Sequence, residues 1–338
     1  MKKILASMAL VLAACGQDNT PTETVEAPVA GTPQHSGLLS EYMNPDVRPG
    51  DDFNAFVNGG WIDTAEIPAD KPGYGIGIML RDQSQEHVKT IIEESAAGDF
   101  AKGSDEQKVG DLYASYMDMD TRNKLGVTPL NAEFEKIDAL KDHQELAVYF
   151  AEANKLGISM PFQFWQTADF KDPEHYMMVT FQGGLGLPDR DFYFLEDEKS
   201  VEIRTKYIEH IEKMFDLAGL ENGGEAANML MALETRIAAE QMKKEDVRDW
   251  ATNYNKVPTA KLSELMPQFA WETFLTEAGI PDLDNVVVLQ TDYMKALDGI
   301  IHDISMDDWK TYLQWSALNE TAGLLNETLD LQNFEFYS

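Results

Sequence analysis

The chain has 338 residues, which is long enough for one large domain or two smaller ones. Its content of 43% hydrophobic and 25% charged residues is ordinary for a globular protein, but 59 acidic against 27 basic side chains give a net charge of −32. Such a field repels nucleic acid and anionic membrane surfaces, so nucleic acid is excluded as an expected partner. We interpret the excess of acidic residues as a feature that keeps an exported protein soluble. The alternative is that it attracts cations or basic peptides, in a way that depends on salt.

The first residues are typical of an export signal rather than of a folded domain. Two lysines are followed by an apolar stretch over residues 4–14, which is too short to span a bilayer. The stretch ends in Leu-Ala-Ala-Cys, which resembles a bacterial lipoprotein signal that is cleaved before the cysteine. We therefore expect a signal peptide over residues 1–14 and lipid attachment at Cys15, with a plain secretory signal as the alternative.

Residues 15–37 are expected to form a flexible tether that is anchored by the lipid. They contain three prolines among Thr, Glu, Ala and Gly and have no apolar periodicity. A lipid anchor places the protein in the cell envelope, on the periplasmic or another extracytoplasmic face. Gly16 rather than an aspartate follows the cysteine, which favours the outer membrane where there is one. With one cysteine in the sequence no intrachain disulfide is possible, so the body over residues 38–338 must be stabilised by its core.

The sequence of the body, residues 38–338, predicts mainly helices. Ser104 and Gln107 form a capping pattern ahead of apolar residues at helical spacing. Further helices are expected over residues 146–156 and 207–218, ended by Gly157 and Gly219, over residues 229–242, and from Ser305, where Trp309, Tyr312, Leu313, Trp315 or Ser316, and Leu318 are expected to be buried.

Strand signals are few. Residues 162–166 and 177–181 are short, aromatic or β-branched, and could pair as a small sheet, whereas residues 286–289 fit either a strand or the buried start of a helix. The predicted fold class is therefore mainly α, a large multi-helix domain with a minor β component.

The run from Gly184 to Tyr193 requires an unusual amount of local chemistry. It contains two glycines and a proline, which respectively widen and restrict the backbone conformations that are available. Asp189 and Asp191 flank Arg190, so that ion pairing and turn capping are both possible. This composition predicts a conformationally demanding turn.

The histidines do not predict a metal centre. The closest two, His143 and His175, are 32 positions apart (175 − 143), whereas an HExxH zinc site needs two histidines four apart on one helical face. His143 and His210 each belong to a His-x-Glu pair, whose members do not share a helical face. We expect all six histidines to be ordinary side chains on helix surfaces or partly buried.

Other catalytic patterns are missing from the sequence as well. There is no Gly-x-Ser-x-Gly elbow, Walker loop or dinucleotide fingerprint. Asp118 and Asp120 lack the glycine and glutamate of a calcium loop and are more consistent with a helix end. The six tryptophans are expected in the core rather than on a sugar-binding platform. No catalytic or metal-ligating residue is therefore predicted in this chain.

Several stretches, taken in order, resemble the N-terminal part of the neprilysin-like zinc endopeptidases, the family of neprilysin and the endothelin-converting enzymes. Their order and spacing make the resemblance specific, and it extends over about residues 38–338. The matching stretches are Pro49–Phe53, Asn58–Trp61, Ile67–Asp70, Leu80–Asp82, Lys108–Asp118, Gly184–Tyr193, Ala232–Ala238, Arg248-Asp249, Tyr254-Asn255, Pro267–Trp271 and Trp309–Leu313.

The resemblance implies a largely helical domain that covers the catalytic domain and encloses a cavity that limits substrates to peptides. The family's HExxH and its other catalytic groups lie in the later half, for which this chain has no matching positions. Zinc is thus implied for the full-length enzyme but not for this chain, which is expected to be inactive alone. The implied partners are peptide substrates and a missing C-terminal catalytic domain, and residues 333–338 have the character of a cut in the chain.

The motif residues Gly186, Pro188, Asp189, Arg190 and Asp191 are then expected to form an ion-paired structural corner rather than a catalytic group.

One departure from the family pattern concerns substrate recognition. Many members place an arginine before an aromatic-Gly pair, where it helps to bind the substrate's C-terminal carboxylate. Here Tyr74-Gly75 is preceded by Gly73, which favours endopeptidase over dipeptidase activity for the full enzyme. The alternative functions are a non-enzymatic envelope lipoprotein that binds peptides or partner proteins and, on charge alone, a calcium- or cation-binding lipoprotein.

Overall fold

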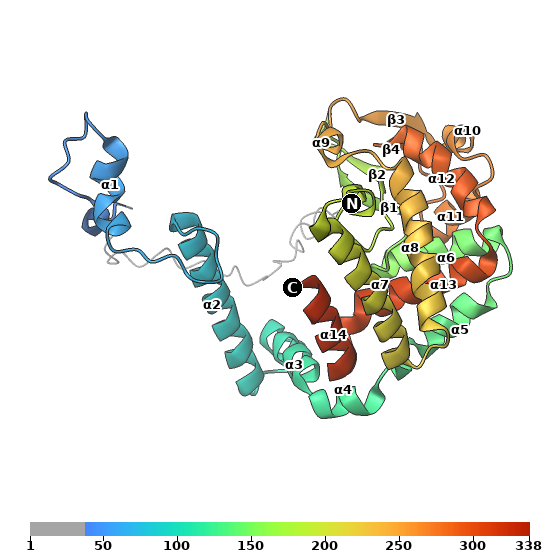
Figure 1. Cartoon of the computed structure of the whole chain (residues 1–338), viewed down its shortest axis with the longest axis horizontal. Helices are drawn as coiled ribbons and strands as arrows, with labels where there is room; N and C mark the ends of the chain where they lie inside the picture. Colours follow the sequence, from blue (N-terminus) through green and yellow to red (C-terminus); the bar gives the residue numbers. More distant parts are fainter. Residues whose placement is uncertain (1–37) are drawn as a thin grey trace, which may run out of the picture. The chain divides into compact units, whose positions relative to one another are not determined.

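The computed structural model describes residues 38–338, so that the expected signal peptide, Cys15 and the tether lie outside the described residues. The described chain divides into two compact units, residues 38–90 and 91–338, whose boundary falls within helix α2 (Ile76–Ala97). Helices dominate both units, and the second contains one four-stranded sheet (Figure 1). The predicted fold class, mainly α with a minor β component, is confirmed.

The first unit contains the short 3-10 helix η1 (Ser40–Tyr42), α1 (Phe53–Ile62) and most of α2. Asp52 caps α1 and accepts a hydrogen bond from the Ala55 amide at 2.8 Å. Gly60 lies where α1 packs on the preceding segment, because a Cβ there would lie 2.9 Å from the Met43 carbonyl oxygen. Trp61 packs against rings before and after α1, with ring centroids 6.3 Å from Tyr42 and 6.1 Å from Tyr74.

The second unit is built from helices that local sequence signals delimit. The α-helices are α3 (Asp105–Met117), α4 (Met119–Leu125), α5 (Asn131–Ala139), α6 (His143–Leu156), α7 (Glu198–Ala218), α8 (Gly223–Glu240), α9 (Lys244–Val247), α10 (Leu262–Leu265), α11 (Trp271–Ala278), α12 (Thr291–Asp303), α13 (Met306–Thr321) and α14 (Glu327–Tyr337). The 3-10 helices are η2 (Thr128–Leu130), η3 (Arg190–Tyr193), η4 (Thr259–Lys261) and η5 (Ala322–Leu324).

Most predicted helix ends are confirmed. Ser104 and Ser305 cap α3 and α13 by accepting hydrogen bonds from the amides three residues later. Gly157 and Gly219 end α6 and α7 in the left-handed conformation, with φ of 73° and 71°. The predicted start of α8 at residue 229 is wrong, because the helix begins six residues earlier.

Asp118 ends α3 and caps α4 through the Thr121 amide at 3.0 Å, in agreement with the helix-end interpretation.

The sheet has the strand order β1-β2-β4-β3. The strands β1 (Phe162–Ala168) and β2 (Tyr176–Gln182) pair antiparallel, as predicted. The ambiguous segment forms β4 (Asn285–Val288), which pairs parallel to β2. The strand β3 (Asn255–Pro258) was not predicted from the sequence. It is a four-residue edge strand that ends in proline and alternates half-buried with exposed positions.

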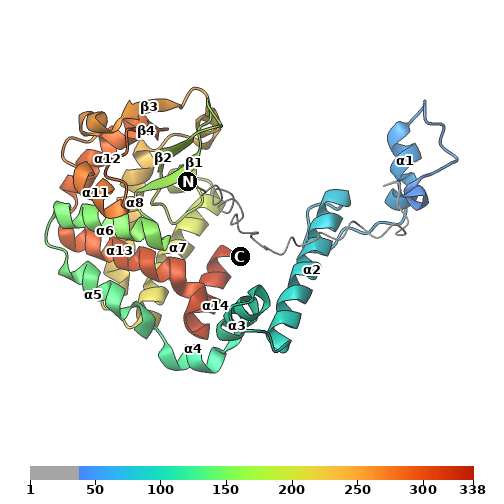
Figure 2. The same ribbon diagram turned by 180° about the vertical axis from the view of Figure 1, so that it is seen from behind.

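The core of the second unit lies among α6, α7, α8, α12, α13 and one face of the sheet (Figure 2). Phe150 packs edge-on against Phe162 and Trp309, with centroids at 6.2 and 5.8 Å. The residues of α13 that were predicted to be buried are buried, both alternatives included: Trp309, Tyr312, Leu313, Trp315, Ser316 and Leu318. A smaller apolar cluster covers the other face of the sheet: Met177, Val179, Val287 and Leu289.

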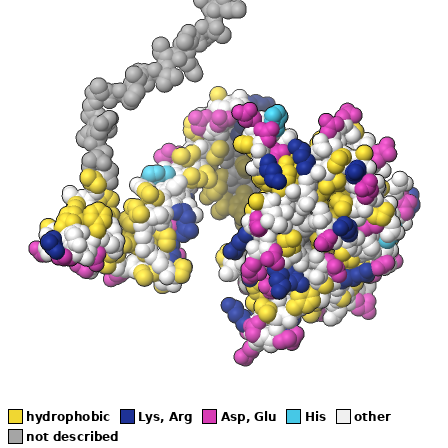
Figure 3. Space-filling model, turned by 90° about the horizontal axis from the view of Figure 1, so that it is seen from above, with side chains coloured by type: hydrophobic (Ala, Val, Ile, Leu, Met, Phe, Trp, Pro, Cys, Tyr) yellow, Lys and Arg dark blue, Asp and Glu magenta, His cyan; other side chains and the backbone are white. Residues whose placement is uncertain are grey.

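On the face that Figure 3 shows, acidic side chains are dispersed among other side chains rather than gathered in one patch. Within residues 38–338, every helix is too short or too polar to cross a membrane.

Candidate functional site

The Gly184–Tyr193 run follows β2 and ends in η3, and its glycines are required by close contacts. Gly184 has φ of +83°, and a Cβ there would lie 2.6 Å from the Tyr312 hydroxyl oxygen. At Gly186 a Cβ would lie only 1.8 Å from the Tyr207 hydroxyl oxygen. The run therefore approaches α13 and α7 more closely than any side chain permits.

The charged residues of the run connect it to the end of α8 and to the start of α9. Asp189 caps η3 through the Asp191 amide at 2.9 Å and pairs with Lys244 at 3.2 Å. Arg190 donates to the Ala238 carbonyl at 3.1 Å, and its distance to the Asp191 carboxylate is 3.9 Å. Pro188 lies exposed just before them. These contacts attach the run to the neighbouring helices through both side-chain and backbone partners.

Glu234 lies on α8 directly beneath the run, with only 1% of its surface exposed. Its carboxylate accepts hydrogen bonds from the Gly186 amide at 3.1 Å, the Tyr193 hydroxyl at 2.5 Å and the Tyr207 hydroxyl at 2.9 Å. The Trp315 indole in turn donates to the Tyr207 hydroxyl at 3.2 Å. Within the described part of the chain, no lysine or arginine pairs with this carboxylate.

Burial dominates the electrostatics of this group. It raises the pKa of Glu234 to about 7, although the hydrogen bonds from Tyr193, Gly186 and Tyr207 act to lower it. Burial also raises the pKa of Tyr193 and of Tyr207 well above their ordinary value, so that both hydroxyls remain donors. At neutral pH Glu234 is therefore poised between its ionised and protonated forms.

Sequence reasoning missed Glu234 as a distinct group, because one glutamate among 59 acidic residues gives no signal. A signal was present in its spacing. Glu234 falls on the apolar stripe of α8, four residues after Leu230 and three before Ile237, both of which are fully buried. A carboxylate on a buried stripe requires hydrogen-bond partners, which the run supplies.

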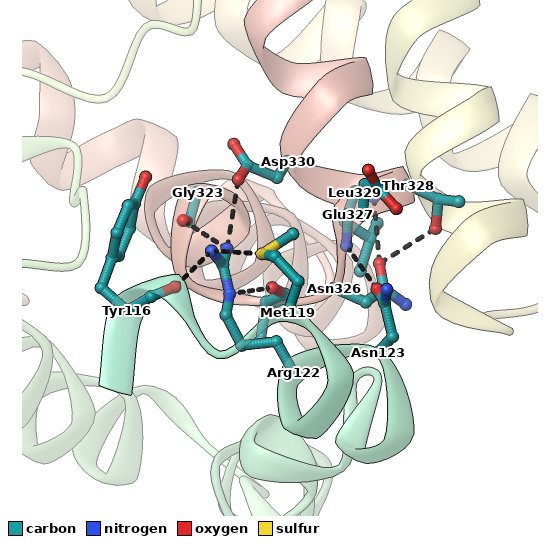
Figure 4. A network of polar contacts seen from close by, with 11 residues as sticks. Tyr116, Met119, Arg122, Asn123, Gly323, Asn326, Glu327, Thr328, Leu329 and Asp330 are labelled. Atoms are coloured by element: carbon teal, nitrogen blue, oxygen red, sulfur yellow. Dashed lines mark hydrogen bonds and ion pairs between the residues drawn. The ribbon is translucent and has the colours of Figure 1, made fainter. Parts of the chain in front are cut away.

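A second polar network joins α4 to α14 (Figure 4). The buried Arg122 donates to the carbonyls of Leu325 at 2.7 Å, Gly323 at 2.7 Å and Tyr116 at 3.0 Å, and it pairs with Asp330 at 3.1 Å. All five donors of a guanidinium lie in one plane, which suits it to the converging carbonyls at a helix end. The geometry gives Arg122 a structural role.

The described histidines do not fit a zinc centre. His143 and His302 stack between α6 and α12 with centroids 4.4 Å apart, and His175 pairs with Asp172 on the β1–β2 connection. Residues 38–338 contain no group of three or more His, Cys, Asp or Glu side chains that could hold a metal ion.

His210 is buried more completely than the sequence suggests. It stacks on Phe336 at 4.6 Å and accepts a hydrogen bond at Nδ1 from the Gln332 amide at 3.1 Å. Burial lowers its pKa to about 4, so that it is neutral at physiological pH.

The fold defines a class: a helical region with a small mixed sheet and an aromatic core that contains a buried polar network, in which the described residues hold no metal cluster of their own. The family model for the N-terminal region of peptidase family M13 matches residues 49–338. The chain belongs to peptidase family M13, and the neprilysin-like resemblance is confirmed at this level.

The similar proteins of known name are consistent with this family. Endothelin-converting enzyme 1 of Rattus norvegicus is 26% identical over 342 residues, which cover 96% of this chain and 44% of the relative. Endothelin-converting enzyme-like 1 of Mus musculus is 26% identical over 83% of this chain and 38% of the relative. The chain thus spans less than half the length of these relatives.

The solved structures of similar fold include the zinc metalloprotease Zmp1 of Mycobacterium tuberculosis in complex with an inhibitor. Its TM-score is 0.76 at 31% identity, over 90% of this chain and 47% of that one. PepO of Lactobacillus rhamnosis has a TM-score of 0.63 at 19% identity, which shows a shared fold. The lipoprotein signal and the cellular location stay predictions.

Proposed function

We propose that this chain is the N-terminal, cavity-forming part of a zinc metalloendopeptidase that acts in peptide proteolysis. The observation that supports this most is the match to peptidase family M13 over residues 49–338. In the proposal, zinc and its ligands belong to a C-terminal catalytic domain, because the described residues offer no metal cluster. The chain alone then neither binds catalytic zinc nor hydrolyses peptides.

Exposed apolar side chains in each unit support a partner domain. In the first unit Phe53, Ile67 and Leu80 are 67%, 61% and 57% exposed, and in the second unit Leu331 and Phe334 on α14 are 53% and 63% exposed. Contiguous patches of exposed apolar side chains mark surfaces that another protein covers, and the proposal assigns these side chains to such patches. The proposed occupant is the catalytic domain.

An activity assay tests the proposal. The purified 338-residue chain is incubated with zinc and a quenched fluorescent peptide, alone and with a separately prepared M13 catalytic domain. We expect no cleavage by the chain alone, and cleavage that a chelator abolishes when both parts are present. Chelator-sensitive cleavage by the chain alone would overturn the inactivity. Reading the nucleotide sequence beyond the Ser338 codon is a cheaper check, because the proposal expects it to encode HExxH.

The location is part of the proposal. The Leu-Ala-Ala-Cys sequence supports a lipid anchor at Cys15 after removal of residues 1–14, with residues 15–37 as a tether at the outer membrane. Fatty-acid labelling of the expressed protein tests it. Label should be incorporated into the natural sequence and lost in the Cys15→Ser variant, whereas equal labelling of both would contradict it.

A non-enzymatic lipoprotein that binds peptides or partner proteins is the alternative, and a cavity in the second unit favours it. Solution behaviour separates the two functions. A free-standing binding protein is expected to be soluble and monodisperse by itself, whereas the N-terminal part of an enzyme is expected to aggregate or to require its catalytic domain.

A further inference from the structure

A cavity of about 200 Å³ lies against Glu234 and the Gly184 run. Its inner walls are buried side chains of α8 and α13, and its mouth is formed by partly or fully exposed residues at the ends of α13 and α14 and after α6. The lining residues are Ser159, Gly184, Leu185, Gly186, Glu234, Tyr312, Trp315, Ser316, Asn319, Glu320 and Tyr337. The volume is below the roughly 300–1,000 Å³ of sites for drug-sized ligands, so the cavity suits a small group.

The lining carries two carboxylates and no basic residue. Glu234 lies at the inner end and Glu320 at the exposed mouth, where it accepts a hydrogen bond from the Ser159 hydroxyl at 2.5 Å. Among the residues that the structure describes, neither carboxylate forms an ion pair. A buried carboxylate is strongly stabilised by an opposite charge, so this arrangement favours a cation in the cavity.

The remaining walls select the kind of cation. Tyr312, Trp315 and Tyr337 line the cavity, and Tyr312 and Trp315 are only 1% and 2% exposed. Aromatic faces attract ammonium and guanidinium groups, most strongly where water is excluded. The ordinary ligands of a hard metal ion would instead be several oxygens at fixed distances, and no such group of carboxylates exists in the described chain.

We propose that this cavity binds a small organic cation, an alkylammonium or guanidinium group, with Glu234 and Glu320 as its counter-charges. The same chemistry is presented by a free amine or guanidine and by a lysine or arginine side chain of a peptide. The inference does not rest on the proposed peptidase function, because the site lies entirely within the second unit and its test does not measure cleavage.

Binding should depend on pH through Glu234. The other titratable groups that face it are Tyr193, Tyr207, Tyr312 and Tyr337, and burial raises the pKa of each hydroxyl, so that they stay neutral. Glu320 at the mouth is the remaining charged group of the lining. With the pKa of Glu234 at about 7, its ionised fraction rises from roughly 10% at pH 6 to roughly 90% at pH 8. The apparent affinity for a cation should therefore rise by up to about tenfold over this range.

A titration of the ¹⁵N-labelled 338-residue chain tests the site. The probes are n-butylammonium and butylguanidinium, with n-butanol as the neutral match. The reporter is the indole N–H resonance of Trp315, assigned with the Trp315→Phe variant. We expect a saturable shift of this resonance with both cations, stronger at pH 8 than at pH 6, and none with n-butanol. An equal response to n-butanol, or no shift with either cation, would overturn the proposal.

Variants separate the site from general electrostatic attraction. Glu234→Gln and Glu320→Gln should each weaken binding at least tenfold at pH 8. Glu272→Gln makes the same change of charge on the exposed face of α11 and should leave binding unchanged. Glu234→Gln removes an acceptor from buried hydroxyls and could prevent folding. If the Glu234→Gln protein does not fold, the comparison of Glu320→Gln with the natural chain tests the site. Equal weakening by Glu272→Gln would contradict the proposed site.

The source of the cation is decided by a short capped peptide with one central arginine, whose match contains citrulline instead. If the arginine peptide binds more tightly than butylguanidinium, the site takes a peptide side chain. If it binds equally or less tightly, the site takes the free small cation. A citrulline peptide that binds as well as the arginine peptide would contradict the proposal, because citrulline has no positive charge.

Discussion

At the scale of single residues, Gly186 shows why the conspicuous run contains glycine. A Cβ at this position would overlap the Tyr207 hydroxyl, and the Gly186 amide donates to Glu234. The position thus combines a steric requirement with a polar one, and both concern partners that are distant in the sequence.

The variant Gly186→Ala should lower the free energy of unfolding by roughly 2–4 kcal/mol, because the new methyl displaces Tyr207 and weakens the hydrogen bonds to Glu234. Urea unfolding measures this change. Gly299→Ala is the matched control, since a Cβ there meets nothing within 4 Å and α12 gains helix propensity. A Gly186→Ala protein as stable as this control would contradict the packing described.

Glu234 also predicts a pH dependence of stability. Its folded pKa of about 7 lies above the ordinary 4.5, so its favourable contribution is complete below pH 4.5 and is lost as the pH rises through 7. The loss is about 1.4 kcal/mol per pH unit within that window. His210 acts in the opposite direction, because its lowered pKa of about 4 makes acidification below pH 6.5 destabilising.

A comparison of the natural chain with the Glu234→Gln variant isolates the contribution of Glu234 to the pH dependence of stability. The free energy of unfolding of the variant, relative to that of the natural chain, should increase between pH 5 and pH 7 and then level off. Urea midpoints at pH 5, 6, 7 and 8 give the difference. A difference that is constant with pH would show that Glu234 does not titrate in this range.

At the scale of elements, local signals were predictable and distant partnerships were not. The serine caps of α3 and α13 and the glycine ends of α6 and α7 involve neighbours within a few residues, so the sequence shows them directly. The ambiguity of residues 286–289 was resolved by β2, a partner more than 100 positions earlier. Arg122 escaped notice for the same reason, because its partners on η5 and α14 lie about 200 positions later.

Arg122 therefore holds α14 in place. Arg122→Met should lower the free energy of unfolding by roughly 2–4 kcal/mol, because it removes a buried charge-assisted donor from three carbonyls. Hydrogen exchange should show the largest loss of protection at the amides of α14. The exposed Arg248→Met is the control and should change stability by less than about 0.5 kcal/mol. Protection of α14 that is unchanged in Arg122→Met would refute this role.

At the scale of the whole molecule, the two units differ in the core that they contain. Residues 38–90 bury almost nothing, with Gly59 as the one buried position among them, whereas the second unit contains the large aromatic core. Sequence composition does not reveal this difference, since both units are rich in apolar residues. It becomes visible only when the packing of each side chain is known.

Hydrogen exchange on the isolated chain should therefore be fast over residues 53–90 and slow over β1, β2 and α13. Addition of an M13 catalytic domain should slow exchange in the first unit, if that domain covers its apolar side chains as proposed. Mass spectrometry of peptic fragments measures both. Strong protection of residues 53–90 in the chain alone would contradict the expectation.

The position of α2 has a practical consequence for taking the protein apart. Because the unit boundary falls inside this 22-residue helix, a cut at residues 90–91 would leave two broken helical ends and expose backbone amides and carbonyls on each. The link between α2 and α3 contains Gly98 and Gly103, the latter with φ of +93°, and lies outside both helices. A cut after Gly98 would keep α2 whole but would separate its last turn from α3, because Gly110 packs closely against the Ser95 carbonyl.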